Sequence, residues 1–117
     1  MSEAFVGGNG AKSTTGPREQ FLLVKLAEEC NEVAQRALKQ AQYGANEAQK
    51  GNPTNSARLR DEILDFSIIV NLLHDAGEFY LWGEDEFEEA KVAKIEKMRK
   101  SLTYSQSLGM IPQGVKL

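Results

Sequence analysis

The sequence is poor in the features that mark secreted and membrane proteins. It contains one cysteine, Cys30, so no disulfide can form within a single chain, and we expect a reducing compartment. No apolar run is long enough to cross a bilayer. The first residues also lack the apolar segment of a signal peptide. We therefore expect a cytoplasmic protein without a membrane partner.

The chain also has no excess of positive charge. Its 117 residues carry a formal net charge of −3, and the isoelectric point is about 5.2. A protein with this balance has no basic field that would attract nucleic acid, so we expect no nucleic-acid partner. An anionic ligand would need a few local lysines and arginines, or a bound cation.

The hydrophobic pattern predicts helices, because no segment alternates between apolar and polar residues as a strand does. Apolar residues recur at helical spacing over about 17–42 and again over about 85–102. Pro17 suits the first turn of the first of these helices, and Tyr43-Gly44 is predicted to end it. A third helical segment begins at Thr54 or Asn55 and ends near Gly77. The sequence therefore predicts an all-α fold, a bundle of three main helices followed by a short C-terminal segment.

The composition divides the chain into a core domain and two tails. Residues 1–16 are small, polar and rich in glycine, so we expect a flexible N-terminal tail. The predicted helical domain covers residues 17–103. Residues 104–117 have no clear period and are predicted to form a C-terminal tail.

The helix predicted in the middle of the sequence carries two acids where apolar residues are expected. At about 100° per residue, Glu62 lies on the same face as Phe66, Ile69 and Leu73. Asp65 falls between Ile69 and Leu72, so both acids are predicted to lie in the middle of the apolar arc. An unpaired buried carboxylate costs several kcal/mol, and two carboxylates at i, i+3 also repel each other. Three kinds of compensation are possible: protonation, a basic partner such as Arg58, or a cation held by several oxygens.

The first helix carries a second acidic group, "EECNE", which contains Glu28, Glu29 and Glu32. This face also bears basic residues and lies largely away from the apolar stripe, so in isolation it is typical of a solvated surface. The stripe consists of Leu23, Leu26, Ala27, Cys30, Val33, Ala34, Ala37, Leu38 and Ala41. If the two helices are antiparallel neighbours, the carboxylates of both groups converge. Oxygen ligands in that number suit Mg²⁺, or Mn²⁺ as a substitute, better than zinc.

The single histidine, His74, argues against a different metal chemistry. Ferritin-like di-iron bundles use a Glu-x-x-His motif, and His74 does not follow any of these acids at that spacing.

The order "EECNE" and later "EILD" resembles the EExxE…ExxD signature of the MazG-like all-α nucleoside triphosphate pyrophosphohydrolases. The resemblance covers roughly residues 20–100. One feature departs from the family pattern: residues 33–61 separate the two motifs, which is at or beyond the long end of the usual spacing. The segment 43–54 is therefore interpreted as a local elaboration near the substrate.

The resemblance implies an enzyme that cleaves a nucleoside triphosphate between its α and β phosphates. Carried over by position, it implies that Glu29, Glu32, Glu62 and Asp65 bind Mg²⁺. Glu28 matches the first acid of the motif and would support the metal ligands or orient water. Glu32 or Glu29 is the residue that we expect to orient the attacking water. The resemblance also implies a homodimer or homotetramer.

The phosphates of such a substrate need positive partners, and five residues are candidates. These substrate-binding candidates are Arg36, Lys39, Arg58, Lys94 and Lys97. The main alternative is a non-enzymatic helical regulatory or scaffold dimer whose acids form structural ion pairs. That alternative predicts no dependence on metal.

Overall fold

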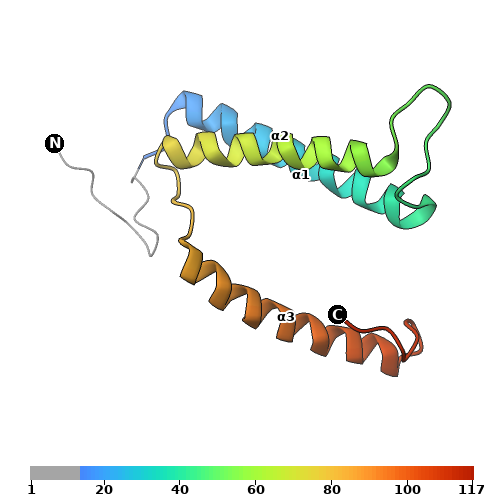
Figure 1. Ribbon diagram of the computed structural model, residues 1–117. Coiled ribbons are helices and arrows are strands. Elements are labelled where there is room, and N and C mark those ends of the chain that lie inside the picture. Colours follow the sequence, from blue (N-terminus) through green and yellow to red (C-terminus); the bar gives the residue numbers. More distant parts are fainter. Residues whose placement is uncertain (1–13) are drawn as a thin grey trace. The chain divides into compact units, whose positions relative to one another are not determined.

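The computed structural model describes residues 14–117, and regular secondary structure in that range is entirely helical. The three helices are α1 (Pro17–Tyr43), α2 (Asn55–Asp75) and α3 (Glu84–Ser107) (Figure 1). The all-α prediction is therefore confirmed for the described residues. Most of the predicted N-terminal tail, residues 1–13, lies outside them.

The first two helices begin and end close to the predicted positions, for the predicted reasons. Pro17 is the first residue of α1, where its missing N–H needs no partner. Gly44 ends this helix with a φ of 92° and donates its N–H to the carbonyl of Gln40 at 2.8 Å. At the start of α2, the Thr54 hydroxyl accepts a hydrogen bond from the backbone N–H of Ala57 at 3.2 Å.

The third helix is longer than predicted. Its first turn is acidic, which complements the positive end of the helix dipole, but it ends at Ser107 rather than at about residue 102. The residues that follow return to α3. The Gln106 side-chain amide donates to the carbonyl oxygens of Pro112 and Val115, both at 2.9 Å, and Gln113 donates back to the Gln106 carbonyl at 3.1 Å. The C-terminal residues are thus hydrogen-bonded to the end of α3.

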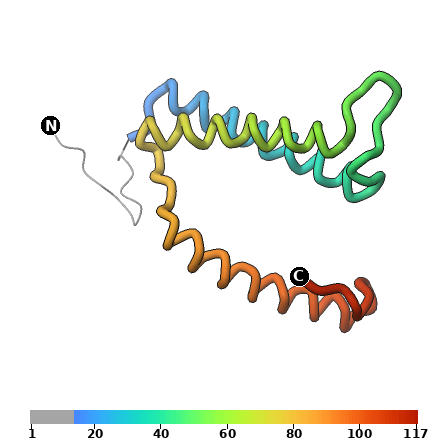
Figure 2. The backbone as a smooth tube through the Cα atoms, in the orientation of Figure 1, coloured from blue at the N-terminus to red at the C-terminus, as the bar shows by residue number. Residues whose placement is uncertain are grey.

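The chain divides into two compact units: the first ends at Tyr80 and the second begins at Leu81. In the first unit, α1 and α2 run antiparallel and pack against each other along their length (Figure 2). Leu22 and Leu73 are the buried apolar side chains among residues 14–117, and both belong to this helix pair. In the same range, no helix combines the length and apolar character needed to cross a membrane.

The face of α1 that is least exposed differs from the prediction. Leu26 and Val33 of the predicted stripe are half-buried, but Leu23 and Leu38 are 39% and 68% exposed. The alanines of the stripe and Cys30 are exposed as well. The buried or half-buried residues of α1 mostly recur at a spacing of three or four, and they are Glu19, Leu22, Lys25, Leu26, Glu29, Val33, Arg36 and Gln40. The polar face that was interpreted as solvated is therefore partly enclosed.

A buried asparagine fixes the connection between α1 and α2. Asn55 is only 6% exposed, and its side-chain amide donates to the carbonyl of Gly44 and to the carboxylate of Glu47, each at 3.0 Å. The backbone N–H groups of Asn55 and Ser56, which have no partner within α2, donate to the carbonyls of Glu47 and Ala45. The loop thus satisfies the first donors of α2 and is held against the start of that helix.

Candidate functional site

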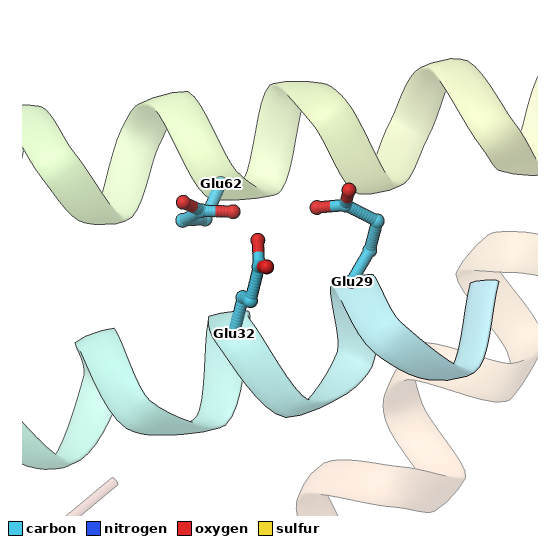
Figure 3. Close-up of side chains that lie close together, drawn as sticks. All are labelled: Glu29, Glu32 and Glu62. Atoms are coloured by element: carbon cyan, nitrogen blue, oxygen red, sulfur yellow. The ribbon is translucent and has the colours of Figure 1, made fainter. Parts of the chain in front are cut away.

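Three carboxylates from the two packed helices converge on one small volume. Glu29 and Glu32 project from α1 and Glu62 from α2, and their carboxylates point toward one another between the helices (Figure 3). One oxygen from each lies within 4.8 Å of the others. The i, i+3 spacing places the two α1 glutamates on neighbouring positions of one helix surface, and the antiparallel packing brings Glu62 opposite.

Part of this cluster is sheltered from water and unpaired. Oε2 of Glu29 and Oε2 of Glu62 are buried and accept no hydrogen bond within the described residues. Within residues 14–117, none of the three carboxylates forms an ion pair, and Arg58 forms none with Glu62 or Asp65. The basic partner considered for Glu62 from the sequence is therefore absent there. Protonation and a bound cation are the two compensations that remain.

The crowding of negative charge raises the pKa of two of these groups. Hydrogen bonding to Glu32 raises the pKa of Glu62 to about 7, with further contributions from burial and from the charges of Glu32, Glu29 and Asp65. Burial is the main cause that raises the pKa of Glu29, followed by the charges of Glu32 and Asp65. Without a cation, the cluster therefore holds a proton near neutral pH.

The other two predicted acids lie differently. Asp65 is exposed and is not one of the three convergent carboxylates, although its charge is close enough to raise the pKa of both Glu29 and Glu62. The prediction that Asp65 occupies the middle of a buried apolar arc is therefore wrong, because it lies at the exposed edge of that face. Glu28 is exposed and pairs with Lys25 at 3.0 Å.

Three of the predicted cations belong to the same helix pair. Arg36 is half-buried, and its Nη1 is enclosed without a hydrogen-bond acceptor. Lys39 and Arg58 line a polar cavity of about 260 Å³ at the end of the pair where the loop joins α1 to α2. The other residues of its wall are Tyr43, Glu47, Gln49, Pro53 and Asn55.

The remaining predicted cations, Lys94 and Lys97, are both exposed on α3 in the second unit. Lys94 lines an apolar groove of about 420 Å³ together with Trp82, Phe87 and Met98. Their predicted contact with substrate stays a prediction.

Sequence reasoning missed Tyr43 and Asn55 as residues of a cavity wall. It treated Tyr43 only as the last residue of a helix and Asn55 only as a possible cap. The available signal was the polar loop between the two motifs. Such a loop can fold back on the start of the next helix, where the Asn55 side chain bonds to it.

The donor set of the cluster fits a hard divalent cation. All the ligand atoms are carboxylate oxygens, and Glu29 and Glu62 each have a buried oxygen without a hydrogen-bond partner. Mg²⁺ and Mn²⁺ prefer such ligands, and binding of either ion would remove the mutual repulsion of the glutamates.

Comparisons of this chain with protein-family models, with curated proteins and with solved structures found no match. The functional argument therefore depends on the carboxylate cluster, the neighbouring cations and the two sequence motifs.

Proposed function

We propose that the protein is a Mg²⁺-dependent nucleoside triphosphate pyrophosphohydrolase, which converts a (d)NTP to the monophosphate and pyrophosphate. The observation that supports it best is the convergence of Glu29, Glu32 and Glu62 with buried, unpaired oxygens. These residues occupy the acidic positions of the two motifs that resemble the MazG-like signature. The bond that is cleaved, between the α and β phosphates, is assigned from that resemblance.

Each acidic residue has a role in this proposal. Glu29, Glu32 and Glu62 hold Mg²⁺, and Asp65 completes the ligand set from the edge of the cluster. When bound there, Mg²⁺ would supply positive charge to the triphosphate oxygens and would lower the pKa of a water bound to it. Glu32 or Glu29 orients the attacking water. Glu28 forms an ion pair with Lys25 and directly precedes Glu29 in the sequence. Its role in this proposal is to orient the carboxylate of Glu29.

Positive side chains on the same helix pair would neutralise the leaving diphosphate. Arg36 and Lys39 follow the α1 acids by one and two turns, and Arg58 precedes Glu62 by one turn. Phosphoryl chemistry is promoted largely by such charge neutralisation and by positioning of the reacting groups. Lys94 and Lys97 are further candidates for the same task.

We also propose that the protein is a homodimer or homotetramer. Few apolar side chains of the helix pair are buried, whereas Leu38, Leu64 and Ile68 are 68%, 52% and 49% exposed. Apolar surface of this extent on a small helical protein is typical of an interaction site. Light scattering after size-exclusion chromatography measures the state directly, and a monomer at micromolar concentration would contradict this part of the proposal.

A panel of nucleoside and deoxynucleoside triphosphates tests the proposed activity. The protein is incubated with each in the presence of Mg²⁺, and the products are separated and identified. We expect pyrophosphate and a monophosphate from at least one substrate, and loss of turnover in excess EDTA. Release of orthophosphate and a diphosphate would contradict the proposed bond. No hydrolysis of any substrate, with no effect of Mg²⁺ on melting, would favour the non-enzymatic helical dimer.

A further inference from the structure

We propose that the cavity at the loop end of the helix pair is a diphosphate-binding site that acts without a metal ion, through Lys39 and Arg58. Its ligand is inorganic pyrophosphate or the terminal diphosphate of a nucleotide. The link to catalysis rests on the proposed function, but binding of the free diphosphate does not.

The backbone around this cavity is held in place before any ligand arrives. Lys39 and Tyr43 come from the last turns of α1, and Arg58 comes from the first turns of α2. The loop that closes the cavity is tied to α2 by the buried amide of Asn55, which bonds to both Gly44 and Glu47. A loop that is already held in this way loses less conformational entropy when the cavity binds a ligand.

The charges of the cavity favour an anion. Neither Lys39 nor Arg58 forms an ion pair within residues 14–117, so both cationic groups are available to a ligand. Among residues 14–117, Glu47 is the only acid in the wall, and one of its carboxylate oxygens accepts a hydrogen bond from Asn55. A guanidinium can bind phosphate oxygens with two parallel hydrogen bonds, and an ammonium adds a compact positive charge. Because the two cations come from opposite helices, they suit a ligand with two linked phosphoryl groups better than a ligand with a single phosphate.

The cavity lies at a suitable distance from the carboxylates. At about 1.5 Å per residue, Lys39 lies about 10 Å beyond Glu32 along α1, and Arg58 lies about 6 Å beyond Glu62 along α2. Arg36 occupies the interval on α1, where its Nη1 is buried without an acceptor. A triphosphate whose reacting group is at the carboxylates can therefore extend its other phosphates toward the cavity, past a series of positive charges.

Calorimetric titration of the full-length protein with pyrophosphate in excess EDTA tests the site. We expect measurable binding, weakened about 10-fold or more by Lys39→Gln or Arg58→Gln, because each removes a charge-assisted hydrogen bond. Glu47→Gln keeps an acceptor for Asn55 and removes the negative charge, so it should tighten binding. Arg60→Gln, an equal change of charge at an exposed position of α2, is the matched control and should have little effect. Circular dichroism confirms that each variant keeps its helices.

Two outcomes would overturn the inference: no binding of pyrophosphate without metal, or Lys39→Gln and Arg58→Gln variants that bind it as the Arg60→Gln variant does. Titration with a nucleotide carrying an uncleavable α,β-methylene bridge distinguishes the two ligand sources. Loss of affinity for this nucleotide in the same variants assigns the cavity to substrate as well as to the free product. Turnover that is unaffected by these variants would reject the link between the cavity and catalysis, while leaving both the diphosphate site and the proposed activity intact. Metal-free pyrophosphate binding without hydrolysis of any triphosphate would reject only the activity.

Discussion

Binding of Mg²⁺ to the glutamate cluster should release protons in an amount that depends strongly on pH. Hydrogen bonding to Glu32, together with burial and nearby charge, raises the pKa of Glu62 to about 7. A metal ion binds the ionised carboxylate, so any proton held by the cluster must leave when the ion binds. The number released therefore reports the protonation state of the cluster before binding.

The expected size of this effect follows from the pKa of Glu62. A group with a pKa of about 7 is about 90% protonated at pH 6, about 50% at pH 7 and about 10% at pH 8. Mg²⁺ binding should thus release about 0.9, 0.5 and 0.1 proton at these three pH values, plus any contribution from Glu29. Because protons compete with the metal, apparent affinity should rise over the same interval.

Titration calorimetry in buffers with different ionisation enthalpies measures the protons released. The Glu62→Gln variant should bind Mg²⁺ more weakly and should lose most of the pH dependence. Asp61→Asn removes one negative charge from an exposed neighbouring position and should behave like the wild type. Mg²⁺ binding with no proton release at pH 6, or with the same release in the Glu62→Gln variant, would refute the reasoning.

Three further predictions concern stability and turnover. The first is measured by urea unfolding in EDTA at several pH values. Glu62 should contribute most to the free energy of unfolding below about pH 4.5, and this contribution should be lost as the pH rises through about 7, because the folded state holds the proton more tightly. The Glu62→Gln variant should lose this pH-dependent part of the stability. Asn55→Ala should lower the free energy of unfolding by about 1–3 kcal/mol by leaving two acceptors without their donor, whereas Asn46→Ala in the same loop should change it little. Asp65→Asn should nearly abolish turnover and keep the helical circular dichroism spectrum; an active variant would remove Asp65 from the ligand set.

The helices themselves could be predicted from the sequence because their signals are local. Pro17 and Gly44 mark the ends of α1, and Thr54 marks the start of α2. The position of Glu62 on the face of α2 that also carries Leu73 followed from the helical period alone, and Leu73 is fully buried. These features depend on residues within one or two turns of each other.

The enclosed face of α1 could not be predicted, because it depends on the neighbouring helix. The stripe that contains Leu23 and Leu38 is more apolar than the face that contains Glu29 and Arg36, yet the latter is less exposed. Hydrophobicity alone cannot predict how exposed a helix face is when the charges on that face are compensated by a proton, a cation or an anion. The return of the C-terminal residues to Gln106 was missed for a similar reason, since those hydrogen bonds join residues with no shared period.

The central claim is that a divalent cation neutralises the glutamates between α1 and α2, and thermal melting with and without Mg²⁺ tests it most directly. A ligand that binds only the folded state adds about 2.7 kcal/mol to the free energy of unfolding when its concentration is 100 times its dissociation constant. The melting temperature of the wild type should therefore rise clearly in millimolar Mg²⁺. At pH 8, where Glu62 is mostly ionised, the Glu62→Gln variant should melt above the wild type without metal, because one repulsive charge is gone, and should respond less to Mg²⁺. A wild type whose melting temperature does not change with Mg²⁺ or Mn²⁺ would contradict the account.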